Sequence, residues 1–306
     1  MGARAYKTYK KDEIKVLKLQ EFCQPVELKK ALDLLAVAGD QLKPLAGGTD
    51  LIPAARQGEL KIKGFLDLSR LEELKGIKEE GREIHLGSLT TFSQLELSPL
   101  IKDQVPLLAE AASTVGSPQI RNQGTIGGNI ANASPAADTV TALVALEAQA
   151  RLVSSQGIRV VPVDELLCGM GETGIQPQEI IQEVFFAIPP PENRNGFVKL
   201  GRRKALAIAR MNMAVIITLE DGVITRARVA LGAVGPNPYR NQILEGVLEG
   251  RKPSPSLLEE FTSEAEQEVA AKLGPRPSAP YKREAIKGIA RDLLSRLFFG
   301  NGQVVA

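Results

Sequence analysis

Two glycine-rich segments carry residue types that could bind a phosphate group. LAGGTDL spans residues 45–51 and TIGGN spans residues 125–129, and each places Gly-Gly beside a hydroxyl residue. Glycine tolerates positive φ and close approach to its backbone, so successive N–H groups can converge on an anion without lysine or arginine. One such pair alone is more often a tight turn at the end of a strand. Two pairs in one chain favour a phosphate site built mainly of backbone.

Side chains that usually perform catalysis or bind metals are scarce. The only histidine, His85, lies in a predicted strand without a serine or cysteine partner, which favours a partly buried strand histidine. The two cysteines, Cys23 and Cys168, are too few for a disulfide framework, a structural zinc site or an iron–sulfur cluster. We therefore predict no catalytic residue and no metal site, and a bound organic cofactor is the economical source of any chemistry.

A third glycine segment, GMGETG at residues 169–174, matches the dinucleotide-binding pattern G-x-G-x-x-G in letters only. That pattern must follow a strand and open a helix. Here it follows the helical sequence VDELL, and Pro177 lies just beyond it. We predict a loop that does not bind a nucleotide in the Rossmann manner.

The elements that must position the first two segments begin with alternating helix and strand signals. Pro25 starts a helix through VELKKALDLLAVAG, and GFLDLS at 64–69 reads as a strand. EEGREIHLG is the second arm of a hairpin, and prolines at 99 and 106 divide the next helical stretch into two or three short helices. AADTVTALVALEA predicts a deeply buried helix. Residues 120–139 show no helical or strand period, so irregular backbone is expected there.

The second half contains stronger signals. A hairpin is predicted with its turn near Gln156-Gly157, and another around Asp221-Gly222. Three consecutive prolines in AIPPPENRNG, residues 187–196, suggest a boundary between two domains. Two helices are predicted near the end, over PSLLEEFTSEAEQEVAAKL and YKREAIKGIARDLLSRLFF. Strands followed by helices favour an α+β domain here.

Composition narrows the function classes. The 306 residues suggest about two domains. The 38 basic and 36 acidic residues leave a net charge of +2, which argues against nucleic acid binding. The apolar run MAVIITL is far shorter than the roughly 20 residues of a membrane span. The opening MGARAYKTYKKDEIKVLKL has no apolar core of a secretion signal, and Tyr6 occupies the position where myristoylation requires serine or threonine. We expect a cytoplasmic protein.

The two glycine segments, extended to AGGTDL and TIGGNIANASPAAD, closely resemble the two flavin-binding loops of the FAD-binding (medium) subunits of molybdenum hydroxylases, the xanthine dehydrogenase and carbon monoxide dehydrogenase family. The resemblance covers nearly the whole chain. FVKLGRRKALAIARMNMAV is similar to the family's F-x-K-x-x-R-R segment, and LGAVGPNPYR and PYKREAIKGIARDLL also match in order and spacing.

This resemblance implies an α+β fold: a two-subdomain FAD-binding fold of the vanillyl-alcohol oxidase/PCMH type, followed by a C-terminal α+β domain with an antiparallel sheet. The implied bounds are 1–180 for the FAD-binding domain, with subdomains of about 1–60 and 61–180, and 185–306 for the C-terminal domain.

The resemblance also implies a function. The chain would be the electron-transfer subunit of an oxidoreductase that is active only in a complex, and would bind FAD. Electrons would pass from [2Fe-2S] clusters of a small partner subunit through FAD to a terminal acceptor. Molybdopterin would be bound by a large partner subunit. Neither molybdopterin nor [2Fe-2S] is expected in this chain.

The implied site residues follow the family's loops. The FAD pyrophosphate would lie between the two segments, with Gly128 at positive φ. Asp138 would accept from ribose or adenine groups, or would be a charge at a helix N-terminus. Lys199 would lie near the flavin ring, or would be a solvated charge. The implied loop residues are Pro44, Leu45, Ala46, Gly47, Gly48, Thr49, Asp50, Leu51, Thr125, Ile126, Gly127, Gly128 and Asn129.

The resemblance also implies two apolar contacts to the cofactor, and the sequence departs from the family's pattern at one place. Val115 and Ile181 fall where the family places apolar contacts to the cofactor, and plain core packing explains them equally well. Relatives commonly carry an acidic residue in R-R-x-x-D-I-A, whereas this chain has Leu206 and Ala207, so NAD is not assigned as the acceptor. The substrate of the complex, whether purine, aldehyde, N-heterocycle or CO, stays open.

Two other classes stay open as well. A self-contained flavoenzyme of the vanillyl-alcohol oxidase type would want catalytic tyrosine, histidine or arginine around the ring, and four tyrosines and one histidine leave few candidates. A flavin-free scaffold subunit would not need the glycines.

Overall fold

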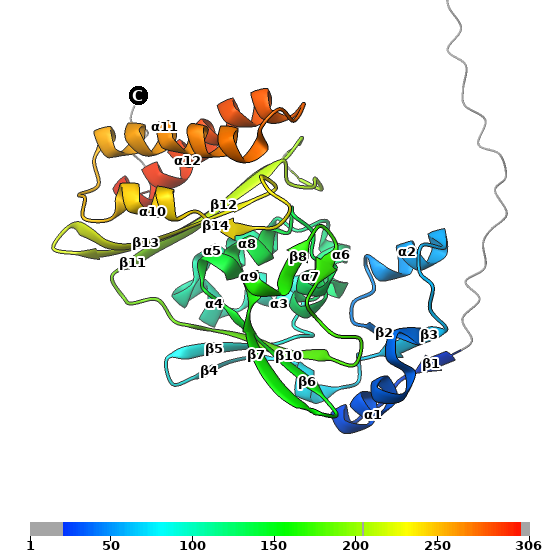
Figure 1. Ribbon diagram of the computed structural model, residues 1–306. Coiled ribbons are helices and arrows are strands. Elements are labelled where there is room, and N and C mark those ends of the chain that lie inside the picture. The colour runs from blue at the N-terminus through cyan, green and yellow to red at the C-terminus, as the bar shows by residue number, and fades with distance from the viewer. Residues whose placement is uncertain (1–20, 204, 301–306) are drawn as a thin grey trace, which may run out of the picture.

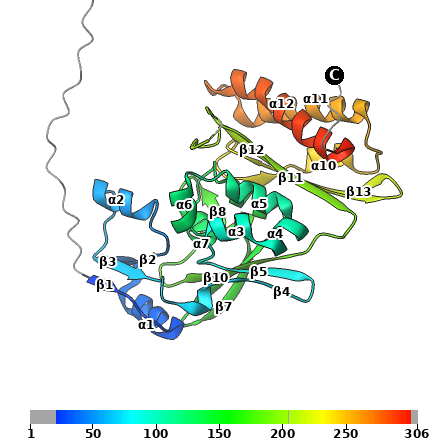
Figure 2. The ribbon, with the colours of Figure 1, turned by 180° about the vertical axis from the view of Figure 1, so that it is seen from behind.

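The computed structural model describes residues 21–203 and 205–300. A small N-terminal lobe lies beside a stack of four layers (Figure 1). The layers are a five-stranded sheet, a group of short helices, a second sheet and a pair of long helices, and the view from behind shows the same order (Figure 2). The expected fold class, α+β with an antiparallel sheet in the C-terminal part, is confirmed.

The first lobe is a three-stranded parallel sheet in the order β1-β3-β2. Helix α1 is amphipathic, and its Ala31 and Leu35 are fully buried against the sheet, as the spacing of apolar residues predicts. The elements are β1 (Glu21–Cys23), α1 (Leu28–Ala38), η1 (Gly39–Gln41), β2 (Leu42–Leu45), α2 (Leu51–Gln57), β3 (Gly64–Asp67) and η2 (Glu72–Leu74).

The second lobe is built on an antiparallel sheet in the order β4-β5-β10-β6-β7. Its strands are β4 (Ile77–Glu80), β5 (Glu83–Gly87), β6 (Gln149–Ser154), β7 (Gly157–Pro162) and β10 (Ile180–Ala187). Its helices are α3 (Phe92–Leu97), α4 (Pro99–Gln104), α5 (Pro106–Ser113), α6 (Pro118–Gln123), α7 (Ile126–Asn132), α8 (Asp138–Ala145) and α9 (Val163–Leu166), and a short hairpin adds β8 (Leu167–Gly169) and β9 (Glu172–Thr173).

Helix α8 is the centre of this lobe. Every one of its residues is buried, as the apolar sequence predicts, because the second lobe packs on one side and the C-terminal sheet on the other. The prolines at 99 and 106 separate α3, α4 and α5, which confirms the predicted short helices.

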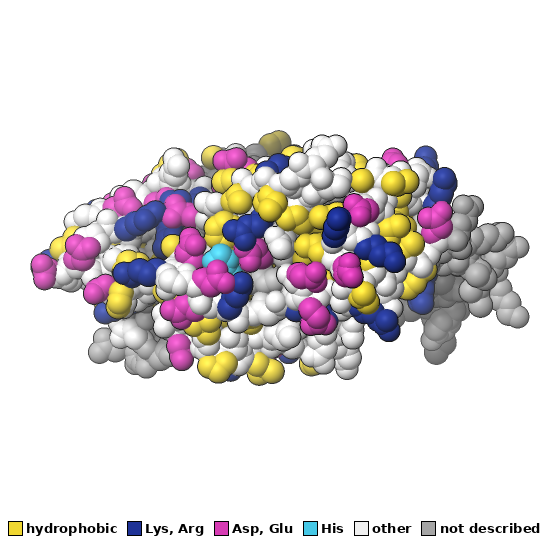
Figure 3. Space-filling model, turned by 90° about the horizontal axis from the view of Figure 1, so that it is seen from below, with side chains coloured by type: hydrophobic (Ala, Val, Ile, Leu, Met, Phe, Trp, Pro, Cys, Tyr) yellow, Lys and Arg dark blue, Asp and Glu magenta, His cyan; other side chains and the backbone are white. Residues whose placement is uncertain are grey.

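The outer face of the five-stranded sheet carries charged side chains of both signs around the histidine, shown in cyan (Figure 3). His85 stacks on Phe185 with 5.2 Å between ring centroids, and its Nδ1 lies 3.2 Å from Glu183 Oε1. Only 6% of His85 is exposed. The interpretation as a buried strand histidine is confirmed.

Two expected domain limits need correction. Strand β3 lies between β1 and β2, so a division at residues 60 and 61 would remove the middle strand of the first sheet. Strand β10 lies between β5 and β6, so an end at residue 180 would remove the middle strand of the second sheet. Sequence patterns do not reveal this because both strands pair with partners distant along the chain. We place the limits after η2 and after β10.

The C-terminal domain is an antiparallel sheet in the order β11-β12-β13-β14 with helices on its outer face. The predicted turn is present, with Asp221 at φ 50° and Gly222 at φ 76°, the type I′ geometry that favours Asp-Gly. The elements are β11 (Asn193–Leu200), β12 (Met211–Glu220), β13 (Val223–Gly232), β14 (Tyr239–Arg240), α10 (Gln242–Leu248), α11 (Pro255–Leu273) and α12 (Ala279–Phe299).

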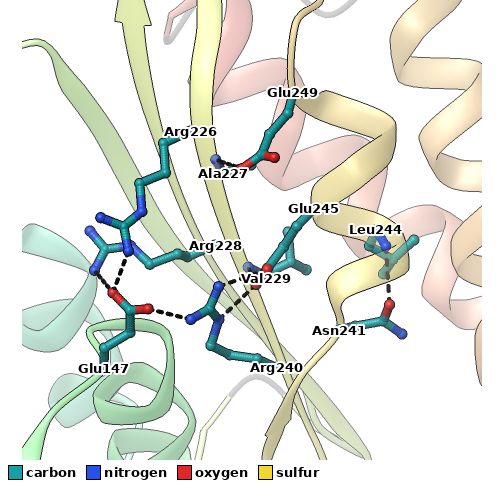
Figure 4. A network of polar contacts seen from close by, with 10 residues as sticks. All are labelled: Glu147, Arg226, Ala227, Arg228, Val229, Arg240, Asn241, Leu244, Glu245 and Glu249. Carbon is teal, nitrogen blue, oxygen red and sulfur yellow. Dashed lines mark hydrogen bonds and ion pairs between the residues drawn. The ribbon is translucent and has the colours of Figure 1, made fainter.

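An ion network holds the C-terminal sheet to the second lobe (Figure 4). Glu147, in the turn after α8, accepts from Arg226 at 2.8 Å, from Arg228 at 3.1 Å and from Arg240. Arg240 also pairs with Glu245 of α10 at 2.7 Å. Burial lowers the pKa of Arg228, and the Glu147 carboxylate acts against that shift. The network therefore supplies the negative charge that a buried guanidinium requires.

Among the described residues, no helix is long and apolar enough to span a bilayer. The opening segment considered for targeting signals, residues 1–19, lies outside the described residues.

Candidate functional site

A cavity of about 670 Å³ lies where the two lobes and the C-terminal domain meet. The loop after β2, the segment from α6 to the start of α8, strand β10 and the loop after β11 all contribute to its wall. Its volume is in the range typical of cofactor sites. Segments that are far apart in the sequence thus share one wall.

All but two of the predicted site residues line this cavity. Ile126 is fully buried in the core of the second lobe, and Leu45, the last residue of β2, is also absent from the lining. The predicted residues that line it are Pro44, Ala46, Gly47, Gly48, Thr49, Asp50, Leu51, Val115, Thr125, Gly127, Gly128, Asn129, Asp138, Ile181 and Lys199. Their contact with a cofactor stays a prediction.

The first glycine loop presents free backbone donors. Gly48 has φ +69°, and the N–H groups of Ile52 and Ala54 return to Gly48 O and Asp50 O to begin α2. Within residues 21–203 and 205–300, no hydrogen bond uses the N–H groups of residues 47–51. Consecutive uncommitted N–H groups beside a positive-φ glycine form an anion-binding concavity. The first loop fits the predicted phosphate site.

Besides its free N–H group, Gly47 provides a close contact with the backbone at the end of α6. A Cβ atom there would lie 1.9 Å from Gln123 O and 3.1 Å from Gly124 Cα. The first glycine segment therefore touches the backbone immediately before the second segment, and only glycine permits the contact.

The second glycine loop differs from the expectation. Its N–H groups are already used: Ile126 N–H donates to Thr90 O at 2.9 Å, Gly127 N–H to Ser88 O at 2.9 Å, and Gly128 N–H to Thr125 Oγ1 at 3.1 Å. Gly128 is helical, so the expected positive φ is wrong. A Cβ at Gly127 would lie 2.6 Å from the Cβ of Ser88. This loop contributes close packing more than free donors.

The backbone of residues 120–139 is also more regular than expected. It contains the end of α6, all of α7 and the start of α8. Ser117 accepts from Ile120 N–H, and Thr125 accepts from Gly128 N–H, so each hydroxyl caps a short helix, and Pro118 sits at the first position of α6. Capping and burial stabilise helices that the apolar periodicity does not show.

A buried ion pair forms the wall near the C-terminal domain. Lys199 Nζ lies 2.6 Å from Asp138 Oδ2 and donates to Thr114 O at 2.8 Å. The lysine side chain is 11% exposed and the aspartate side chain 5%, so Lys199 is not a solvated charge. Burial raises the pKa of Asp138, while Lys199 and the amide of Asn212 act in the opposite direction.

Asp138 is the first residue of α8, and both of its oxygens already accept hydrogen bonds within the protein, Oδ1 from Asn212 and Oδ2 from Lys199. Its predicted bond to ribose or adenine would be an additional one. Val115 and Ile181 line the cavity and also pack against the core of the second lobe, so core packing is observed and their contact with a cofactor stays a prediction.

Most of the wall residues were not predicted. Ser88, Gln176 and Glu179 come from strand ends and loops without a distinctive motif. The loop between β11 and β12 contributes residues 206–209, where Leu206 has φ 55° and Ile208 is 82% exposed. Only the unusual Leu206-Ala207 pair marked that loop in the sequence.

GMGETG forms the β8–β9 hairpin and opens no helix, which agrees with its assignment as a loop that is not a Rossmann fingerprint. In the described part of the chain, no three His, Cys, Asp or Glu side chains are arranged to hold a metal ion.

Comparison with known proteins identifies both domains. The family model described as the FAD binding domain in molybdopterin dehydrogenase matches residues 16–190, and the model described as the CO dehydrogenase flavoprotein C-terminal domain matches residues 197–297.

Individual relatives agree with these matches. The chain is 35% identical over 279 residues to the nicotinate dehydrogenase FAD-subunit of Eubacterium barkeri, covering 89% of this chain and 94% of the relative. It is 31% identical to a putative xanthine dehydrogenase FAD-binding subunit of Escherichia coli, covering 88% and 92%. A carbon monoxide dehydrogenase structure from Hydrogenophaga pseudoflava superposes with a TM-score of 0.85 at 29% identity, covering 91% of this chain and 97% of the other.

The loop contact gives a first prediction. Gly47→Ala should lower the free energy of unfolding by about 1–3 kcal/mol, because the added Cβ overlaps Gln123 O and the loop after β2 must move away from the end of α6. Urea unfolding measures this. Gly246→Ala is the matched control, since a Cβ there meets no atom within 4 Å and alanine favours the helix. Equal midpoints for wild type and Gly47→Ala would contradict the contact.

The ion pair gives a second prediction. Lys199→Met removes the cation that favours ionised Asp138, so the folded-state pKa of Asp138 rises further above its unfolded value of about 3.9. A raised folded pKa means that stability falls as pH rises between those two values. The loss relative to wild type should therefore be larger at about pH 7.5 than at about pH 4.5.

Urea unfolding of the apoprotein at both pH values checks this prediction. The double variant Asp138→Asn/Lys199→Met should lack the added pH dependence, because no carboxylate remains. A loss of equal size at both pH values would count against the pairing.

Proposed function

The chain belongs to the family of FAD-binding medium subunits of the molybdenum hydroxylases, and from this premise we propose that its cavity holds FAD and relays electrons from a partner's iron–sulfur clusters to a terminal acceptor. Family matches cover both domains, and relatives with over 30% identity align over most of their length. It is an oxidoreductase subunit whose cofactor is FAD.

The observation that carries the site proposal is the run of free N–H groups at residues 47–51, facing the second glycine segment. A pyrophosphate carries negative charge without needing a protein cation when several backbone donors converge on it. Across the cavity, a Cβ at Gly128 would meet only Thr125 Oγ1 at 2.9 Å and Ala46 Cβ at 3.9 Å. Bare backbone on both sides therefore leaves room for the diphosphate.

Neighbouring side chains fit the same placement. Asn129 Oδ1 accepts from Thr139 at 2.7 Å, which leaves the Asn129 amide N–H groups for the cavity side. Lys199 and Asp138 form the wall near the C-terminal domain, and we place them beside the flavin ring. When bound, FAD supplies the redox chemistry, and the chain supplies position and electrostatics.

The partners are proposed from family membership and from what this chain lacks. Two cysteines cannot ligate [2Fe-2S] clusters, and both are free thiols here. We assign the clusters to a small partner subunit and molybdopterin to a large one. Free thiols also suit a reducing compartment, so we place the chain in the cytoplasm. The loop at Leu206 and Ile208 is apolar, and NAD is not assigned as the acceptor.

Cofactor content tests the site. Purified protein should carry about one FAD per chain, and Gly128→Val should lose most of it, because a branched side chain would fill the space facing Ala46. Flavin absorbance measures occupancy, and circular dichroism verifies the fold. Gly246→Val is the control for valine within a helix remote from the cavity. Full occupancy in Gly128→Val would refute the diphosphate placement.

Co-purification tests the assembly. A tagged chain isolated from its native host should bring iron and molybdenum with it, as measured by elemental analysis. The chain produced without its partners should show no hydroxylase activity. A stable complex requires a docking surface of at least about 1,000 Å². Flavin-containing protein that travels without either metal and oxidises a substrate unaided would favour the self-contained oxidase.

A further inference from the structure

A chain of buried hydrogen bonds extends inward from the cavity wall. Lys199 Nζ donates to Asp138 Oδ2 at 2.6 Å, Asn212 Nδ2 donates to Asp138 Oδ1 at 2.7 Å, and Thr141 Oγ1 donates to Asn212 Oδ1 at 2.9 Å. Asn212 and Thr141 are completely buried. Only Asp138 and Lys199 of this set reach the cavity. The chain links α8, β11 and β12.

With Asp138 ionised, the donors and acceptors favour one arrangement. An ionised carboxylate only accepts, so the Asn212 amide must turn its NH₂ toward Asp138. Its oxygen then faces Thr141, whose hydroxyl lies between two acceptors, Asn212 Oδ1 at 2.9 Å and Ala137 O at 3.2 Å, and donates to the nearer one. Without that hydroxyl, a buried amide oxygen would lose its partner, which costs free energy in an apolar surrounding. Thr141 therefore orients Asn212, and Asn212 favours the charged form of Asp138.

Gly232 makes room for this arrangement. A Cβ at that position would lie 2.0 Å from Asn212 Oδ1 and 2.4 Å from Thr141 Oγ1. Its φ is outside the left-handed region, so the backbone conformation does not require glycine. The space for the two polar side chains does.

We infer that Asn212, Thr141 and Gly232 are positioning residues that keep Asp138 ionised against Lys199 and thereby set the reduction potential of the flavin. The inference rests on the proposed placement of the Asp138–Lys199 pair beside FAD. None of the three positioning residues lines the cavity, so they act through the pair.

The sign of the effect follows from charge. With Asp138 ionised, the pair is neutral, and the lysine charge is balanced at 2.6 Å. Loss of the Asn212 donor favours protonated Asp138 and leaves Lys199 with a net positive charge. Positive charge near the flavin favours its reduced anionic form, so the potential rises. Removing Lys199 instead leaves a negative charge and lowers the potential.

The experiment is a spectroelectrochemical titration of FAD-loaded variants at several pH values. Lys199→Met should shift the midpoint potential downward, and Asp138→Asn should shift it upward. Asn212→Leu should shift it upward as well, with a difference from wild type that shrinks as rising pH ionises Asp138 again. On the Asp138→Asn background, Asn212→Leu should add no shift, because the carboxylate through which it acts is gone.

Milder variants keep the test valid if Asn212→Leu does not fold. Thr141→Val removes only the hydroxyl and should shift the potential upward, and Thr141→Ser should restore it. Gly232→Ala should act in the same direction by displacing Asn212, with every polar group retained. Val215→Ala is the control, since it truncates a buried side chain of β12 in the other core. It should cost stability and leave the potential unchanged.

The stability of the apoprotein tests the same inference without flavin. In the apoprotein, Thr141→Val should lose more stability relative to wild type near neutral pH than in acid, because the ionised carboxylate loses support.

The outcomes separate the two proposals. If Lys199→Met and Asp138→Asn leave the potential of bound FAD unchanged, the placement of the pair beside the flavin fails. If those two shift it while Asn212→Leu, Thr141→Val and Gly232→Ala do not, the positioning inference alone is overturned.

Discussion

A buried carboxylate stays ionised only when cations and donors replace the water it has lost. Asp138 is in this situation, because α8 is enclosed between the second lobe and the C-terminal sheet. Lys199 and Asn212, which satisfy it, both belong to the C-terminal domain. The charge of one residue therefore requires the second domain to be docked, and docking in turn completes the cavity wall. Fold and site depend on the same contact.

Glycine serves this architecture at several points for one physical reason. Gly47 lets the loop after β2 touch the end of α6, Gly127 lets α7 approach Ser88, and Gly232 leaves space for buried polar side chains. Of these contacts, none depends on positive φ, whereas Gly48 does adopt it. Glycines that suggest a phosphate site in the sequence therefore have two roles: some leave space for a ligand, and others allow close packing of the backbone. The free N–H groups of the first loop are what distinguish its role from that of the second.

Local patterns predicted the elements that local interactions stabilise. The first helix, which begins at Leu28 and not at Pro25 as expected, the turn at Asp221-Gly222 and the two long C-terminal helices follow from periodicity and turn chemistry. Family resemblance supplied Asp138, Lys199 and the residues of the two glycine loops that line the cavity, but most of the remaining lining was not predicted. Neither source predicted that Lys199 would pair with Asp138, because the partners are 61 positions apart. The central places of β3 and β10 also depend on long-range pairing.

The two lobes and the C-terminal domain contribute different chemical groups to the cavity wall. The lobes supply backbone donors and close glycine contacts, which suit an anionic diphosphate, while the C-terminal domain supplies Lys199 and the loop at residues 206–209. A diphosphate site needs no titratable group. Control of a redox potential needs a charge near the flavin, here Lys199, and a counter-charge that offsets it, here Asp138. Since the Glu147 network also holds this domain in place, the electrostatics at the cavity wall are fixed by contacts well outside it.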